Sequence, residues 1–149
     1  MRYLSCFLAV IGLFLTLACT QHRPDSTQHA SVFSFADTTG KDLEAQPAHD
    51  MINSRPQTIV LDVRTPEEYA RGHIRNARNL NLYDAKFVNR LAQLDRTKTY
   101  VVHCAAGLPN GRSRKAVALL DSLGFKHIYH LNGGLNGWKQ AELPVVTNQ

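Results

Sequence analysis

Short apolar strands alternate with helical segments along most of the chain, and this alternation constrains the fold more than any other feature of the sequence. Runs rich in β-branched residues predict strands at Thr58–Asp62, Thr99–His103 and His127–Leu131. Helices are predicted at 47–54, 66–71, 84–94 and 113–123, the second of them capped by Thr65. Apolar strands separated by helices favour an α/β fold, with a parallel sheet covered on both faces.

The composition is that of one soluble domain. Apolar residues make up 44% and charged residues 19% of the 149 residues, which permits a packed core and excludes a wholly disordered chain. The formal net charge is +5, but the basic residues are scattered. This pattern favours an ordinary basic surface over nucleic-acid binding, and we expect no nucleic-acid partner.

The first residues of the chain have the pattern of a targeting segment. Arg2 is followed by sixteen uncharged residues, which is short for a membrane span of about 20 residues, so a signal peptide is predicted over 1–18. The sequence Leu-Thr-Leu-Ala-Cys at 15–19 resembles a bacterial lipobox. The resemblance implies an acylated Cys19 and a domain held on a membrane of the bacterial envelope, facing the periplasm. An ordinary cleaved signal, which would leave a secreted or soluble periplasmic protein, and an uncleaved N-terminal anchor stay open as alternatives.

The remaining chain divides into a linker and a domain. Residues 19–32 are polar and aperiodic, which predicts a tether, and 33–149 form the predicted domain. Of the three cysteines, Cys6 falls in the signal and Cys19 would carry lipid, so Cys104 is left in the domain. A lone thiol in an oxidising compartment is either buried and inert or kept for its chemistry.

A loop after the second predicted strand carries the strongest indication of chemistry. In α/β sheets ligands bind beyond the carboxyl ends of the strands, where Cys104 lies. Small residues, two glycines and a following helix N-terminus predict a cup of backbone N–H groups that binds an anion and lowers the pKa of a thiol. The predicted nucleophile is Cys104. The predicted anion-binding residues are Ala105, Ala106, Gly107, Gly111, Arg112 and Ser113. The alternative is an inert cysteine before an ordinary loop.

Three segments in order resemble the signatures of rhodanese-like domains, over roughly Asp42 to Val145. They are 61–80 (beginning Leu-Asp-Val-Arg-Thr-Pro-Glu-Glu-Tyr), the loop 104–113, and 131–138 (Leu-Asn-Gly-Gly-Leu-Asn-Gly-Trp). The resemblance implies a five-stranded parallel sheet flanked by helices on both faces. It also implies a sulfurtransferase in which Cys104 takes sulfane sulfur from a small anionic donor such as thiosulfate. A thiol or cyanide then removes the sulfur, and we expect no metal or organic cofactor.

The loop departs from the family pattern in its length. Seven residues separate Cys104 from Arg112, more than is usual in sulfur-handling members or in their phosphatase and arsenate-reductase relatives. The extra residues around Pro109 either widen the pocket or bulge outward. A cysteine-dependent phosphatase or arsenate reductase, and a non-catalytic persulfide carrier or binding module, therefore stay open as alternatives.

Several polar residues have two interpretations. Asp62 and Arg64 follow the first signature and either order the loop or bind each other as scaffold. Ser113 donates to the thiolate, caps the helix, or does both.

His73 is predicted to stabilise a turn. His103 is expected on the opposite strand face from the thiol, and His127 and His130 lack the spacing of metal ligands. Trp138 and Leu135 are predicted to pack the last helix onto the sheet.

Overall fold

A computed structural model describes residues 40–147 of the chain. The predicted signal peptide (1–18), the linker (19–32) with Cys19, and the first residues of the predicted domain lie outside the described residues. The strands are β1 (Lys41–Leu43), β2 (Thr58–Asp62), β3 (His73–Ile74), β4 (Arg78–Asn79), β5 (Thr99–His103), β6 (Ile128–Leu131) and β7 (Val145–Val146). The helices are α1 (Ala45–Ser54), α2 (Pro66–Ala70), α3 (Phe87–Ala92), α4 (Arg112–Ser122) and α5 (Gly134–Gln140).

A five-stranded sheet in the order β1-β6-β5-β2-β4 forms the centre of the fold. All of its neighbouring strands are parallel, as predicted. β3 and β7 form a separate antiparallel pair that the sequence did not predict. Because β5 is the middle strand, the residues that follow it emerge at the centre of the carboxyl edge.

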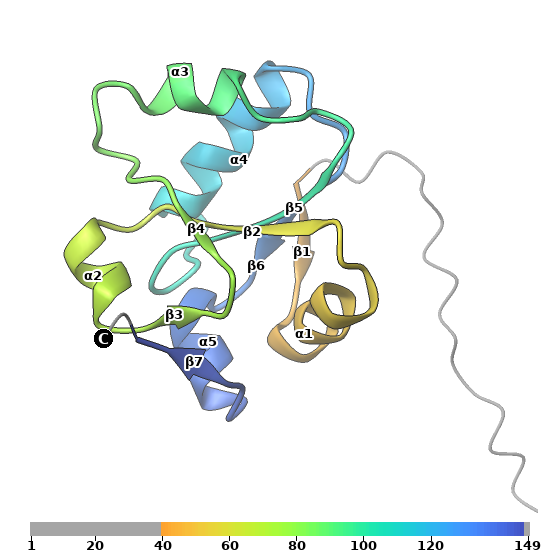
Figure 1. Ribbon diagram of the computed structural model, residues 1–149, viewed down its shortest axis with the longest axis vertical. Coiled ribbons are helices and arrows are strands. Elements are labelled where there is room, and N and C mark those ends of the chain that lie inside the picture. Colours follow the sequence, from red (N-terminus) through yellow and green to blue (C-terminus); the bar gives the residue numbers. More distant parts are fainter. Residues whose placement is uncertain (1–39, 148–149) are drawn as a thin grey trace, which may run out of the picture. The chain divides into compact units, whose positions relative to one another are not determined.

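Helices cover both faces of the sheet (Figure 1). Each face has its own hydrophobic core. On one face α3 and α4 bury Phe87, Leu91, Ala116 and Leu120 against β2 and β5. On the other face α1 and α5 bury residues that include Met51, Leu135 and Trp138. Trp138 is 1% exposed and its indole N–H donates to the Pro144 carbonyl. The predicted packing role of Leu135 and Trp138 agrees with this burial.

The ends of several helices differ from the prediction for local reasons. α1 begins at Ala45 rather than at Pro47. Pro47 is tolerated inside the first turn, because the N–H group that it lacks would have no helical partner there. Residues 84–86 form a turn closed by the Asp84 carboxylate, so α3 begins only at Phe87. α2 has the predicted Thr65 cap, in a reciprocal capping box with Glu68. α4 is followed by Gly124 at φ +85°, a conformation that favours glycine.

Candidate active site

Cys104 lies at the carboxyl edge of the sheet, directly after the central strand β5. Its side chain is buried, and its sulfur is 3.2 Å from the hydroxyl of Ser113, in the first turn of α4. Burial opposes ionisation of this thiol. Hydrogen bonds from the Ser113 hydroxyl and from the amides of Ser113, Gly107 and Ala106 outweigh it and hold the pKa of Cys104 below its ordinary value. Three of the predicted binding residues thus surround the sulfur with donors.

The other predicted loop residues support this cup. The Ala105 carbonyl accepts from Asn136 N–H at 2.8 Å, and the Cys104 carbonyl accepts from Leu135 N–H at 2.9 Å. The first turn of α5 therefore holds the base of the loop. Gly111 is the N-terminal cap of α4, and a Cβ on it would lie 3.7 Å from the Cys104 sulfur. The small residues bring the backbone close to the thiol.

Two glycines allow the loop and the turn after β6 to approach at backbone distance. Gly107 has φ +58°, and a Cβ there would lie 2.6–2.8 Å from backbone atoms of Leu131, Gly133 and Gly134. Gly134 has φ +56° and is equally crowded by the carbonyls of Cys104 and Ala105. Real Cβ atoms do not fit at such distances. The glycines of the third signature therefore serve the cysteine loop, a role that the sequence alone did not indicate.

The extra loop residues bulge outward. Leu108, Pro109 and Asn110 are all exposed, and Gly111 N–H donates to the Leu108 carbonyl at 2.9 Å, which closes a turn. The cleft above the thiol has a volume of about 280 Å³. Its lining residues are Tyr83, Cys104, Ala105, Ala106, Leu108, Asn110, Gly111, Arg112 and Lys115. The inserted residues thus form an exposed turn at the rim of the cleft, and the donors that surround the sulfur come from other residues of the loop.

Arg112, the predicted anion-binding cation, forms an ion pair with Glu68 of α2. Its two terminal nitrogens donate to the two carboxylate oxygens at 2.5 and 2.8 Å. The hydrogen bond from Arg112 lowers the pKa of Glu68 to about 2, and the same bond raises the pKa of Arg112. The ion pair of Glu68 was not predicted, because the position of Glu68 in the first turn of α2 already suits a capping residue. Its partner Arg112 lies 44 positions away in the chain.

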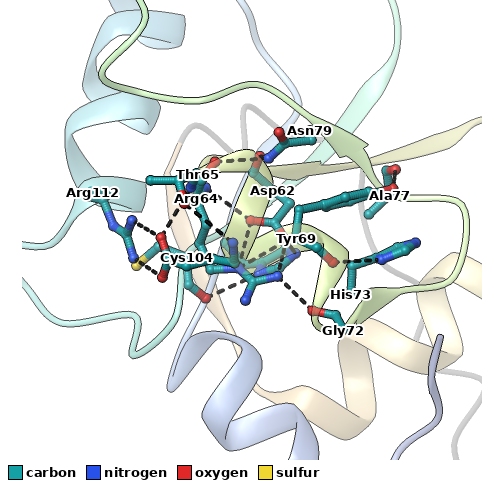
Figure 2. A network of polar contacts seen from close by, with 12 residues as sticks. Asp62, Arg64, Thr65, Tyr69, Gly72, His73, Ala77, Asn79, Cys104 and Arg112 are labelled. Carbon is teal, nitrogen blue, oxygen red and sulfur yellow. Dashed lines mark hydrogen bonds and ion pairs between the residues drawn. The ribbon is translucent and has the colours of Figure 1, made fainter. Parts of the chain in front are cut away.

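Asp62 and Arg64 form a buried network behind the loop (Figure 2). The Arg64 guanidinium binds the Asp62 carboxylate through two nitrogens and donates to the Gly72 carbonyl at 2.8 Å. His103 lies between this pair and the loop. Its Nδ1 is 3.1 Å from the Cys104 carbonyl, whereas its Nε2 is 3.6 Å from Asp62, which is too far for a hydrogen bond. This geometry supports the scaffold interpretation of the Asp62–Arg64 pair.

The remaining histidines that the sequence singled out have structural contacts. His73 stacks on the Tyr69 ring with centroids 3.8 Å apart, and its Nδ1 contacts the Tyr69 carbonyl. His130 bonds to Ser113 and Asp42.

Among residues 40–147, no three His, Cys, Asp or Glu side chains are grouped so as to hold a metal ion. In the same range, every helix is too short or too polar to cross a membrane.

A second cleft, of about 350 Å³, lies between α1, α5 and the turn after β3. Trp138, Arg75 and His49 are among its lining residues, and Cys104 and Arg112 are not. The smaller cleft is the candidate active site, because it holds a buried thiol with a lowered pKa among backbone donors.

A parallel sheet that carries a buried cysteine of lowered pKa among backbone donors at its carboxyl edge has the architecture of α/β proteins that act through a thiolate. The model of the family described as Rhodanese-like domain matches residues 44–141. The chain belongs to this family, as its three signatures implied.

Individual relatives agree with the family assignment. A tRNA uridine(34) hydroxylase of Buchnera aphidicola is 32% identical over 112 residues, which cover 70% of this chain and 33% of that protein. A protein named sulfurtransferase from Allochromatium vinosum is 26% identical, over 70% of this chain and 94% of its own length. The crystal structure of a rhodanese-related protein from Thermoplasma volcanium superposes with a TM-score of 0.63 at 32% identity, covering 72% of this chain and 99% of that one. The chain thus spans about a third of the hydroxylase and nearly all of the other two.

Proposed function

We propose that the protein is a sulfurtransferase that carries sulfane sulfur on Cys104. The Cys104 thiolate attacks the outer sulfur of a donor such as thiosulfate. The donor's sulfur–sulfur bond breaks, sulfite leaves with the bonding electron pair, and a Cys104 persulfide forms. A thiol or cyanide then attacks the terminal sulfur and releases the thiolate. The buried thiol among the amides of Ala106, Gly107 and Ser113 carries the proposal, because these donors stabilise both the thiolate and the persulfide anion.

The family membership and the sulfurtransferase relative support this reaction. The cleft of about 280 Å³ suits a small inorganic anion, and Lys115 and Arg112 on its wall supply positive charge. Because Glu68 neutralises much of the Arg112 charge, the loop amides carry most of the stabilisation of the donor.

Two other enzyme functions fit the site less well. A phosphatase needs a carboxylic acid that protonates the leaving group, but Glu68, the carboxyl group beside Arg112, has a pKa of about 2 and is ionised at neutral pH. An arsenate reductase needs a further thiol, and in the described part of the chain Cys104 is the free cysteine.

The test is the intact mass of the full-length protein after incubation with thiosulfate, beside a Cys104→Ser variant. We expect a gain of one sulfur atom that cyanide removes and that the variant lacks. A folded wild-type protein that gains no sulfur would contradict the proposal. Arsenate and an aryl phosphate would then be the next substrates to test. A protein that forms the persulfide but does not turn over with cyanide or a small thiol would instead be a persulfide carrier.

We also propose that the domain is lipid-anchored at Cys19 and faces the periplasm. The lipobox-like sequence before Cys19 supports this, and the sixteen uncharged residues before the lipobox cysteine fit a signal peptide. Expression with a radiolabelled fatty acid tests the anchor. The wild type should carry label and Cys19→Ser should not. Equal labelling of both proteins, or of neither, would contradict the proposal.

A further inference from the structure

A chain of hydrogen bonds connects the Cys104 thiol to the surface carboxylate of Asp42. The Ser113 hydroxyl lies 3.2 Å from the Cys104 sulfur and 2.9 Å from Nε2 of His130. Nδ1 of His130 lies 2.8 Å from the Asp42 carboxylate. The side chains of Ser113 and His130 are fully buried, whereas that of Asp42 is half exposed. Three different elements, α4, β6 and β1, contribute these side chains.

The tautomer of His130 follows from its partners. The Arg114 hydrogen bond to Asp42 is the main reason why the pKa of this carboxyl lies below its ordinary value, so Asp42 is an ionised acceptor. Nδ1 of His130 must therefore carry the proton in this bond. Burial lowers the pKa of His130, which favours the neutral ring. In a neutral ring protonated at Nδ1, Nε2 is a free acceptor that faces Ser113.

The Ser113 hydroxyl has one proton and two neighbours that can accept it. If the hydroxyl donates to Nε2 of His130, it can only accept from Cys104, which must then be a thiol. If it donates to a Cys104 thiolate, Nε2 has no hydrogen-bond partner unless the ring carries a second proton and donates to the hydroxyl oxygen. A buried, unprotonated Nε2 that faces an oxygen lone pair has no hydrogen bond, which raises the free energy of this state. Formation of the thiolate is thus linked to protonation of His130.

We propose that His130 takes the proton of Cys104 through the Ser113 hydroxyl, and that Asp42 holds the ring and stabilises the resulting imidazolium. The S–H bond of Cys104 breaks as its proton moves to the Ser113 oxygen. The hydroxyl proton of Ser113 moves to Nε2 in the same step. No electrons are exchanged, and the products are a thiolate and an imidazolium joined by the hydroxyl. His130 is a positioning residue, because it reaches the sulfur only through Ser113.

The surroundings of His130 are consistent with one added positive charge. The charged groups that act on the ring are Asp42 of β1, its register partner, and Arg114 of α4, which is itself bound to Asp42. On the other side, the register partner of His130 on β5 is the apolar Val102. Asp42 thus contacts both Arg114 and the protonated His130, and its negative charge offsets the repulsion between these two cations.

The rate of alkylation of Cys104 by iodoacetamide, measured against pH, tests this inference. The full-length protein is used, and the peptide that carries Cys104 is followed by mass spectrometry. His130→Gln keeps a hydrogen-bonding group near the position of Nε2 but cannot take up a proton. We expect it to slow alkylation about tenfold at about pH 7 and to move the profile to higher pH, because the thiolate loses an adjacent cation. Asp42→Asn should give an intermediate effect.

A double-mutant cycle separates a relay from two independent effects. Ser113→Ala should slow alkylation, and adding His130→Gln to it should have no further effect, because the path is already broken. His49→Gln, on α1 at the other face of the sheet, is the matched control and should react like the wild type. Circular dichroism checks that each variant is folded.

An unchanged pH profile in folded His130→Gln, or in Asp42→Asn if the former does not fold, would overturn the inference. Additive effects of Ser113→Ala and His130→Gln would do the same. The inference rests on the proposed function only in taking Cys104 as the nucleophile. Since alkylation requires no sulfur transfer, a protein that fails the thiosulfate test can still pass this one.

Discussion

Replacing Glu68 by glutamine removes the charge that pairs with Arg112 and keeps the shape of the side chain and its place in the capping box. The pKa of Glu68 is about 2, against an ordinary value of 4.5, because Arg112 binds the carboxylate. The gap between these values corresponds to at most about 3 kcal/mol. With 23% of the Glu68 side chain exposed, solvent screening reduces the expected contribution to about 1–2 kcal/mol.

The sign of the pH dependence follows from the lowered pKa. As pH falls, the unfolded chain binds a proton at Glu68 before the folded protein does. The contribution is therefore fully present above the ordinary pKa of 4.5 and is lost as pH falls from 4.5 toward about 2. In Glu68→Gln this pH-dependent part of the stability is missing.

Urea unfolding followed by circular dichroism measures the effect. Glu68→Gln should be less stable than the wild type by about 1–2 kcal/mol at about pH 7, and more than half of this difference should vanish by about pH 3. Glu67→Gln is the matched control, because Glu67 lies in the same first turn of α2 but has no bond to Arg112. A difference that stays constant down to about pH 3, or one equal to that of Glu67→Gln, would refute the reasoning.

Four further changes test other parts of the structure. Gly107→Ala forces a Cβ into backbone atoms at a left-handed residue, so thermal unfolding should show a loss of more than about 2 kcal/mol. Arg64→Met leaves the Asp62 carboxylate buried and unpaired, and the same measurement should show a loss of about 3–5 kcal/mol. Trp138→Leu should cost about 2–4 kcal/mol by leaving a cavity and an unbonded Pro144 carbonyl. Lys115→Gln should raise KM for thiosulfate roughly threefold at low salt with kcat unchanged, since Lys115 lines the cleft without contacting the sulfur. An effect on kcat alone would contradict that last prediction.

The parts of the fold that local sequence encodes were predicted well. β2 and β5 have the predicted bounds, because each is a continuous apolar run with clear ends. The Thr65 cap and the Gly124 end follow from hydrogen bonds and backbone angles that a few neighbouring residues determine. The cysteine loop was also found from sequence, because its small residues and the following helix are contiguous.

The short strands were missed for the opposite reason. β3 and β7 have two residues each, and the register pairs His73 with Val146, which lies 73 positions later in the chain. β1 has three residues, of which only Leu43 is buried. Such segments carry too few residues for a periodic pattern. Their neighbours in space make them strands, by supplying the hydrogen-bond partners that a short segment lacks on its own.

By itself, the sequence determined that this is an α/β protein with a thiol poised at a sheet edge, because apolar periodicity, helix caps and glycines act over a few residues. Only the tertiary structure decided which charged side chains lie beside the residues of the candidate site. The pairing of β1 with β6 places Asp42 against His130, and the position of α2 brings Glu68 to Arg112. These partners are 88 and 44 residues apart. Contacts at such separations depend on how strands and helices are arranged, and no local pattern encodes them.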